Sequence, residues 1–259
     1  ITDKIPKDKN LIKKVLLVKS TLTFLLGLAN HKRNLFKGKV IGITGSIGKT
    51  SVKENLRYLL SKKYNVSASI KSYNNYLGVL LSLGNLNLKS HFAIFEIGTN
   101  NFNEIKKLTQ IIKPSQVIIT NIHPTHLEKL ITTRNIALEK SDIFNNKYNK
   151  NIEVAILAND NIDEKFIVAK AKKQKVSNII TFGSNKDSDI NVIKITKINL
   201  TYYEICVKYK DKKFLLKINK NQIHRLSNLL VCLSIFMYNR IDFAPFTSFV
   251  RKIPLLEGR

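Results

Sequence analysis

The sequence has little cysteine. Its 259 residues contain two, Cys206 and Cys232, and both lie in apolar segments. This pair has neither the pattern of a disulfide framework nor the spacing of metal ligands. The scarcity predicts a protein of the reducing cytoplasm, in which both cysteines serve as buried packing residues.

A long unbroken hydrophobic run is also absent, and no signal peptide is visible. The most apolar stretch near the N-terminus covers residues 11–30, but Lys13, Lys14 and Lys19 interrupt it. Because a membrane-spanning helix needs about 20 predominantly apolar residues in a row, we expect no stable insertion into a membrane. We interpret the stretch as an amphipathic helix docked on the domain that follows.

Acidic residues are scarce as well. Asp and Glu total 18 against 44 Lys and Arg, so the formal net charge is +26. This charge is typical of proteins that bind nucleic acid or anionic membranes, but mutational drift in an A+T-rich genome also enriches Lys together with Asn and Ile. The lysines are spread along the whole chain, without the interleaved aromatic residues of single-strand binders. We therefore expect no nucleic-acid partner, and a nucleic-acid-dependent P-loop ATPase stays as an alternative function.

Residues 40–54 are the most informative stretch of the chain. An apolar run predicts a buried strand, a glycine-rich turn follows, and a helix is expected to begin near residue 49. The candidate phosphate-binding residues here are Gly45, Ser46, Gly48, Lys49, Thr50 and Ser51. Glycines let backbone N–H groups converge on phosphate oxygens, and a helix N-terminus adds partial positive charge. The pattern predicts a phosphate-binding loop, although Ile43 stands where the standard spacing has glycine.

Beyond residue 38, apolar strands alternate with helical periods. The expected strands cover 40–44, 65–69, 92–97, 116–120, 154–158 and 178–182, and the expected helices cover 50–62, 78–86, 103–112, 135–146 and 163–175. Such alternation predicts an α/β fold with a mostly parallel sheet flanked by helices. The pattern changes near residues 190–218, where 190–198, 200–209 and 212–218 predict antiparallel strands, and 223–238 predicts one apolar helix.

Polar residues stand where several of these elements end. Asn74 and Asn75 lie in an Asn-rich turn, and Glu96 ends a buried strand. His126 follows the strand at 116–120, and Lys140 lies in the helix at 135–146. Because the C-terminal ends of parallel strands meet at one crevice, we expect these side chains to converge on one ligand site.

The ordered set of motifs resembles the central, ATP-binding domain of the Mur ligase superfamily, and within it the MurF type. The resemblance runs from about residue 38 to Arg259. The segments that carry it are Gly42-Ile-Thr-Gly-Ser-Ile-Gly-Lys-Thr, Asn74-Asn75 with Gly78, Glu96-Ile-Gly-Thr-Asn, Thr120-Asn121 with His126-Leu-Glu, Lys140, His224 with Asn228, and Gly258-Arg259.

The resemblance implies an enzyme that forms an amide bond with the help of ATP and Mg²⁺. Ligases of this type phosphorylate a peptide carboxylate and let an amine attack the acyl phosphate. The implied substrates are UDP-MurNAc-tripeptide and D-Ala-D-Ala, precursors of peptidoglycan, and the implied protein is a cytoplasmic monomer. A sibling of the MurE or folylpolyglutamate synthase type remains an alternative.

The resemblance also gives roles to the chemical groups. Lys49 would hold the outer phosphates, and Thr50 and Glu96 would hold a first Mg²⁺. His126 would help bind a second Mg²⁺, together with Lys140 in carbamylated form. Lys49, Lys140 and His126 are thus the implied catalytic residues.

The remaining implied roles concern the two ends of the substrates. Asn228 would face the adenine, Arg259 the ribose or phosphates, and Asn74 and Asn75 the acceptor substrate. Simpler explanations stay open for several of these residues. Both asparagines can serve as turn or cap residues. In the same way, Glu96 can be a structural carboxylate, and His126 and Lys140 can be ordinary surface residues.

Both ends of the chain suggest a part of a longer enzyme. We expect residues 1–37 to be a linker and amphipathic helix from a truncated N-terminal domain. Residues 38–259 then form the ATP-binding domain, and the C-terminal domain of the superfamily is absent. On this interpretation the chain binds nucleotide but ligates poorly without its flanking domains.

Overall fold

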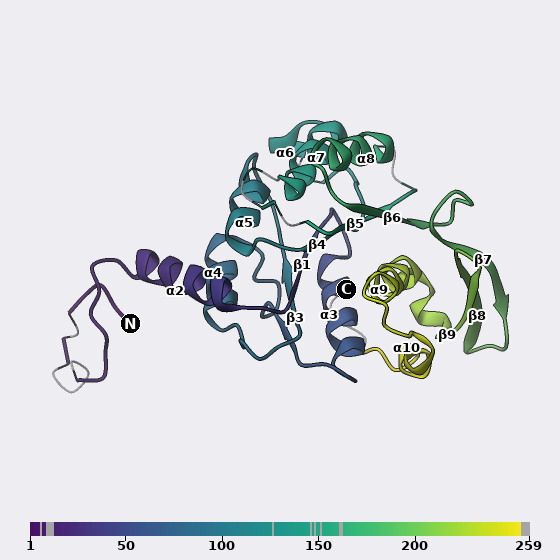
Figure 1. The fold of residues 1–259 in the computed structure, drawn as a ribbon, viewed down its shortest axis with the longest axis horizontal. Coiled ribbons are helices and arrows are strands. Elements are labelled where there is room, and N and C mark those ends of the chain that lie inside the picture. Colours follow the sequence, from purple (N-terminus) through teal and green to yellow (C-terminus); the bar gives the residue numbers. More distant parts are fainter. Residues whose placement is uncertain are drawn as a thin grey trace.

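A nine-stranded sheet organises the residues that the computed structural model describes, which are 1–5, 7–8, 13–125, 127–145, 147, 149–150, 152–160 and 163–254. The first six strands are β1 (Lys39–Thr44), β2 (Val66–Ala68), β3 (Phe92–Glu96), β4 (Gln116–Ile119), β5 (Val154–Ala158) and β6 (Asn178–Gly183). The strand order is β2-β3-β1-β4-β5-β6-β7-β8-β9, and β2 to β6 pair in parallel around β1 (Figure 1). Strand β1 therefore lies between β3 and β4, so the segment after β1 emerges between two strand ends.

The last three strands turn antiparallel. They are β7 (Ile190–Lys197), β8 (Tyr202–Tyr209) and β9 (Lys212–Asn219). Strand β7 pairs in parallel with β6, whereas β7 with β8 and β8 with β9 pair antiparallel. The hairpin between β8 and β9 turns at Lys210, whose φ of 51° lies in the left-handed region. The predicted change of pattern at residues 190–218 is confirmed, with the second strand beginning at Tyr202 instead of residue 200.

Helices cover both faces of the sheet. They are α2 (Thr21–Leu35), α3 (Lys49–Leu60), α4 (Tyr76–Gly84), α5 (Glu104–Ile112), α6 (Leu127–Leu130), α7 (Thr133–Ser141), α8 (Glu164–Lys173), α9 (Leu226–Tyr238) and α10 (Thr247–Val250). Side chains alternate along β1, so Ile41 and Ile43 join one buried cluster and Val40 joins the other. The first cluster packs under α3, α9 and α10, and the second under α2, α4, α5, α7 and α8. These two cores confirm the predicted α/β fold with a mostly parallel sheet.

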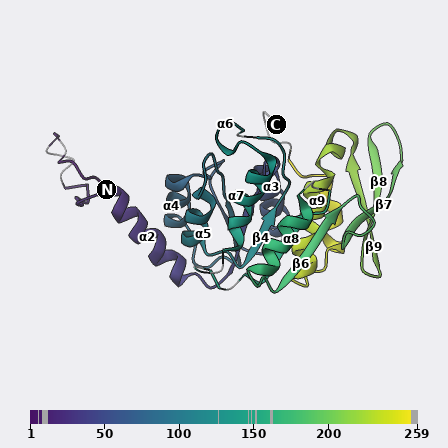
Figure 2. The same cartoon turned by 90° about the horizontal axis from the view of Figure 1, so that it is seen from above.

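The predicted helix at 11–30 is wrong in its bounds. The described residues from 13 to 20 are not helical, and α2 runs from Thr21 to Leu35. The start is set by Ser20, whose side chain accepts a hydrogen bond from the backbone N–H of Thr23. Helix α2 packs against α4 and α5, and its N-terminal end points away from the sheet (Figures 1 and 2). None of the helices in the described ranges is long and apolar enough to cross a membrane.

Two further helices differ from the pattern. The expected helix at 135–146 ends at Ser141, and a 3₁₀ turn, Asp142–Phe144, continues it. The expected helix at 223–238 consists of a 3₁₀ segment, Lys220–Arg225, followed by α9. In both cases the apolar period continues through the 3₁₀ turn, so the sequence pattern does not mark the change.

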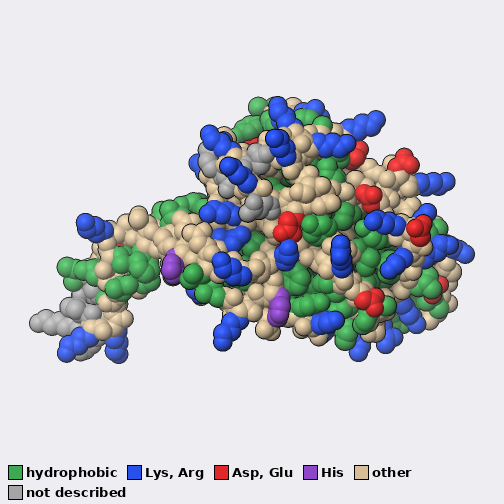
Figure 3. Space-filling model, viewed as in Figure 1, with side chains coloured by type: hydrophobic (Ala, Val, Ile, Leu, Met, Phe, Trp, Pro, Cys, Tyr) green, Lys and Arg blue, Asp and Glu red, His purple; other side chains and the backbone are tan. Residues whose placement is uncertain are grey.

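Lysine and arginine side chains are scattered over the face drawn in Figure 3 and do not gather into one stripe. This distribution matches the spread of basic residues along the chain. It gives no continuous track for the backbone of a nucleic acid on that face, because such a track needs clustered cations.

Candidate functional site

The loop between β1 and α3 has the geometry that its glycines allow. Gly45 has φ 145° and Gly48 has φ 87°, and Gly48 caps the N-terminus of α3. A Cβ added to Gly45 would lie 1.9 Å from the Thr120 hydroxyl oxygen. A side chain at this position would therefore push the loop away from the end of β4.

The end of β4 holds the loop in place. The backbone N–H of Ser46 donates to the Asn121 carbonyl at 3.0 Å, and the N–H of Ile47 donates to the Asn121 side-chain oxygen at 2.8 Å. The Thr120 hydroxyl donates to the Ile47 carbonyl at 2.6 Å. Asn121 thus accepts hydrogen bonds from the amide of Ser46, a predicted phosphate-binding residue, and from that of its neighbour Ile47. The first turn of α3, which includes Thr50 and Ser51, offers N–H groups without intrahelical partners and no side-chain cap.

Two lysines converge on one carbonyl of the loop. The Lys49 ammonium donates to the Gly45 carbonyl at 2.7 Å and to the Ser46 carbonyl at 3.2 Å. The Lys140 nitrogen reaches the same Gly45 oxygen at 3.1 Å, from α7. The pKa of Lys140 falls from 10.5 to about 7, because burial and, to a smaller extent, the charge of Lys49 lower it more than the charge of Glu139 raises it. Lys140 therefore carries a largely neutral amine at slightly alkaline pH.

A cluster of oxygens lies beside the loop. The Thr50 hydroxyl donates to Glu96 at 2.7 Å, and the Asn74 side-chain amide donates to the other Glu96 oxygen at 2.8 Å. The Ser72 hydroxyl lies 3.4 Å from that of Thr50. Glu96 is 2% exposed. Hydroxyl and carboxylate oxygens are what Mg²⁺ prefers, so this set fits the ion, with water or phosphate completing its shell.

Within the described ranges, no group of three His, Cys, Asp or Glu residues is placed to bind a metal. Among the residues that line the cavity over the loop, Glu96 supplies the negative charge. His126 lies outside the described residues, as does Arg259. The roles that the resemblance implies for these two residues stay predictions.

A cavity of about 590 Å³ opens over the loop and the oxygen cluster. It is lined by Ser46, Ile47, Gly48, Lys49, Thr50, Ser51, Ser72, Asn74, Glu96, Asn121, His224, Arg225, Ser227 and Asn228. Asn228 reaches the loop from α9, because a Cβ on Gly48 would meet its side-chain oxygen at 2.9 Å. Residues far apart in the sequence thus form one compartment, whose size suits a nucleotide.

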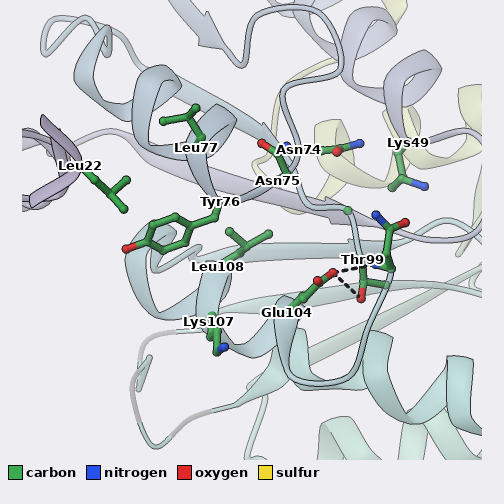
Figure 4. Close-up of a pocket in the computed structure, with 12 residues that line it drawn as sticks. Leu22, Lys49, Asn74, Asn75, Tyr76, Leu77, Thr99, Glu104, Lys107 and Leu108 are labelled. Atoms are coloured by element: carbon green, nitrogen blue, oxygen red, sulfur yellow. Dashed lines mark hydrogen bonds between the residues drawn. The ribbon is translucent and has the colours of Figure 1, made fainter. Parts of the chain in front are cut away.

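A second cavity, of about 970 Å³, adjoins the first (Figure 4). Lys49 and Asn74 line both cavities. Figure 4 shows Leu22 of α2, Tyr76 and Leu77 of α4, and Leu108 of α5 at the far side from Lys49. The second compartment therefore has mostly apolar side chains, beside Lys107, at the end away from the loop and polar side chains where it meets the loop.

The two asparagines of the Asn-rich turn do different things. Asn75 lines the second cavity, and its side-chain oxygen accepts a hydrogen bond from the Gly78 N–H at 2.9 Å and caps α4. Asn74 instead holds Glu96. The capping explanation applies to Asn75, while Asn74 belongs to the oxygen cluster.

Helix α7 contacts the phosphate-binding loop and the wall of the second cavity. Glu139, next to Lys140, is buried and accepts hydrogen bonds from the N–H groups of Asn103 at 2.7 Å and Ile105 at 2.9 Å. It also accepts one from the hydroxyl of Thr99, which lines the second cavity, at 3.3 Å. Glu139 therefore fixes the start of α5, and burial raises its pKa.

Sequence reasoning gave no role to several residues of this region. Asn121 directly follows the strand predicted at 116–120, so a strand-end argument like that for Glu96 could have found it, whereas Ser72 lies in the turn before Asn74. Lys53 and Arg225 are basic residues among 44, and no local pattern distinguished them.

The fold and the site define an α/β domain of the P-loop class, with a glycine loop between a central parallel strand and a helix. Residues 43–236 match the family described as the Mur ligase middle domain. Since this match covers well over half of the chain, the protein belongs to the Mur ligase middle-domain family.

Several curated relatives bear the name UDP-N-acetylmuramoyl-tripeptide–D-alanyl-D-alanine ligase. The one from Rickettsia prowazekii is 38% identical over 194 residues, which are 73% of this chain and 43% of the relative. The one from Buchnera aphidicola subsp. Baizongia pistaciae is 29% identical over 260 residues, 97% of this chain and 53% of the relative. The chain therefore spans about half the length of these relatives.

Solved structures share the fold. MurF from Acinetobacter baumannii superposes with a TM-score of 0.81 at 24% identity, over 94% of this chain and 52% of that one. MurF ligase from Thermotoga maritima in complex with ADP has a TM-score of 0.76 at 24% identity, over 99% of this chain and 57% of that one. At this identity the likeness shows the fold alone.

Proposed function

We propose that this chain is the ATP-binding part of a MurF-type ligase, which joins D-Ala-D-Ala to UDP-MurNAc-tripeptide in the cytoplasm. The family membership and the names of the curated relatives support the proposal. The observation that carries it is that the two cavities meet at Lys49 and Asn74. An enzyme that activates a carboxylate with ATP needs two compartments that open onto the same cation.

The proposed reaction has two steps. A carboxylate oxygen of the tripeptide takes the γ-phosphoryl group of ATP, and ADP leaves. The amine of D-Ala-D-Ala then attacks the acyl carbon, the tetrahedral intermediate expels phosphate, and the amine loses a proton. Phosphoryl transfer depends mostly on positioning and charge neutralisation, so the site needs cations and oriented donors more than a strong base.

The residues over the loop fit that need. Lys49 and the N–H groups at the start of α3 would neutralise the terminal phosphates. The oxygens of Thr50 and Glu96 would hold Mg²⁺, which supplies positive charge at the phosphates when bound. Lys49 already lies 2.7 Å from the Gly45 carbonyl, so it needs only to turn toward a phosphate to take up this role.

Lys140 has the chemistry for a further step. Its neutral amine can add CO₂, forming an N–C bond and releasing a proton, which turns a cation into a carbamate anion. The remaining N–H of such a carbamate would still donate to the Gly45 carbonyl, which the Lys140 nitrogen reaches at 3.1 Å, and its oxygens would offset the charge of Lys49 and could join a metal site. We propose this modification as the form that works in catalysis.

Phosphate release by the native gene product tests the proposal. We expect release to require ATP, Mg²⁺, UDP-MurNAc-tripeptide and D-Ala-D-Ala together. Lys49→Ala should lower ATP affinity at least about tenfold, because it removes a charge-assisted bond to phosphate. Lys165→Ala, an exposed lysine of α8, is the matched control and should leave the affinity unchanged.

Two results would overturn the assignment. Turnover with another amine in place of D-Ala-D-Ala would move the protein to a sibling ligase. ATP hydrolysis that is stimulated by DNA or RNA, with binding that weakens steeply as salt rises, would make it a nucleic-acid-dependent ATPase.

A further inference from the structure

Lys53 is a buried ammonium in the middle of α3. Its side chain is 0% exposed, one helical turn after Lys49. Its nitrogen donates to the Ser69 carbonyl at 2.9 Å and to the Lys71 carbonyl, and it pairs with the Glu54 carboxylate at 3.1 Å. Three acceptors thus meet the three donors that a lysine ammonium has.

Burying a charge in this way is costly, because the ammonium loses its water. Other buried residues of α3, such as Val52 and Leu56, contribute apolar side chains to this core, so the charge of Lys53 is an exception there. Two of the three acceptors of Lys53 are backbone carbonyls of the segment between β2 and α4. The charge therefore serves to hold that segment against α3.

The segment held by Lys53 leads directly to the oxygen cluster. Lys71 has φ 45°, a conformation that favours glycine and needs support from its surroundings. The next residue, Ser72, reaches the Thr50 hydroxyl, and Asn74 reaches Glu96. The Lys71 carbonyl, which Lys53 holds, thus lies one residue before Ser72 and three residues before Asn74.

We propose that Lys53 is a positioning residue, which fixes residues 69–74 so that Ser72 and Asn74 stay beside Thr50 and Glu96. The inference rests on the proposed function, in which this cluster binds the Mg²⁺ of the nucleotide. Lys49 and Lys53 lie four residues apart on one helix. Helix α3 therefore contacts the phosphate-binding loop through Lys49 and holds residues 69–74 through Lys53.

The test compares Lys53→Met with the control Arg57→Met in the native gene product. Arg57 lies on the same helix and bonds to the same Glu54 at 2.7 Å, but its side chain is 55% exposed. For each protein, the affinity for a fluorescent ATP analogue is measured in excess chelator, and the Mg²⁺ concentration at half-maximal phosphate release is measured separately.

We expect Lys53→Met to raise the Mg²⁺ requirement at least about tenfold, as the loss of hydrogen bonds to a charged group implies. Its affinity for the analogue without Mg²⁺ should stay within about twofold of the wild type, because the loop and Lys49 are intact. Arg57→Met should match the wild type in both measurements. A merely structural role would lower the amount of folded protein without moving the Mg²⁺ requirement.

An unchanged Mg²⁺ requirement in folded Lys53→Met would overturn the inference alone. If that variant does not fold, Lys53→Gln keeps N–H donors without the charge. It should show a raised Mg²⁺ requirement, and a wild-type value would again overturn the inference. A wild-type protein whose nucleotide binding and turnover ignore Mg²⁺ would refute the proposed function, and the inference with it.

Discussion

Replacing Lys140 with methionine should stabilise the ligand-free protein at pH 7, and the gain should disappear at high pH. The side chain is 2% exposed, and burial, with the charge of Lys49, lowers its pKa from 10.5 to about 7. Methionine has a similar length and no charge to bury. The variant therefore removes the electrostatic penalty while it keeps most of the packing.

The size of the effect follows from the shift in pKa. Each unit is worth about 1.4 kcal/mol, so the fall from 10.5 to about 7 corresponds to a penalty on the order of 5 kcal/mol. The methionine variant gives up the bond to the Gly45 carbonyl, which offsets about 1 kcal/mol. We expect a net gain of up to about 4 kcal/mol in the free energy of unfolding at pH 7.

The pH dependence has a definite sign. Between pH 7 and 10.5 the folded protein has lost the proton of Lys140, but the unfolded chain still holds it. Stability of the wild type relative to the variant therefore rises by about 1.4 kcal/mol per pH unit in this window and is constant below it. The two proteins should differ most below pH 7 and least above pH 10.5.

Urea unfolding at several pH values between 6.5 and about 10.5 measures the difference. The buffers must be free of nucleotide and depleted of CO₂, so that the amine stays unmodified. Lys165→Met on the exposed side of α8 is the control and should show no such trend. A stability difference between Lys140→Met and the wild type that does not change with pH would refute the reasoning.

Two further predictions concern the loop and the oxygen cluster. Gly45→Ala should lower the melting temperature and abolish measurable ATP binding, because its Cβ would meet the Thr120 hydroxyl at 1.9 Å. The control Gly27→Ala in α2, whose Cβ would have nothing within 4 Å, should instead stabilise the protein by about 0.5–1 kcal/mol. Calorimetry measures the melting temperatures and the binding, and normal ATP binding by Gly45→Ala would contradict the prediction. Glu96→Gln should raise the Mg²⁺ concentration needed for half-maximal phosphate release about tenfold, because the neutral amide keeps the shape but loses the charge; an unchanged value would mean that Glu96 only anchors Thr50.

Much of the fold could be predicted because apolar period and turn residues mark its elements directly. Val40 and Ile41 alternate between the two cores, and the strand ends place Glu96 beside the loop, as expected. Periodicity does not show where a cap begins a helix. Ser20 sets the start of α2 through a local hydrogen bond, and the apolar residues before it gave a misleading earlier start.

Less of the site could be predicted, because its contacts join distant segments. Asn121 accepts hydrogen bonds from the N–H groups of Ser46, which was expected to bind phosphate, and of Ile47. No spacing of residues within the loop reveals these contacts. Lys53 is one cation among many in the sequence, and only its burial against the carbonyl of Ser69 gives it a distinct role.

Helix α7 has a mechanical consequence for the two compartments. Consecutive residues on one helix, Glu139 and Lys140, are bonded to the start of α5 and to the Gly45 carbonyl. A rotation or shift of α7 would therefore displace the start of α5 and the Gly45 carbonyl at the same moment. In the proposed ligase, this one helix would then keep the spacing between the bound nucleotide and the peptide carboxylate.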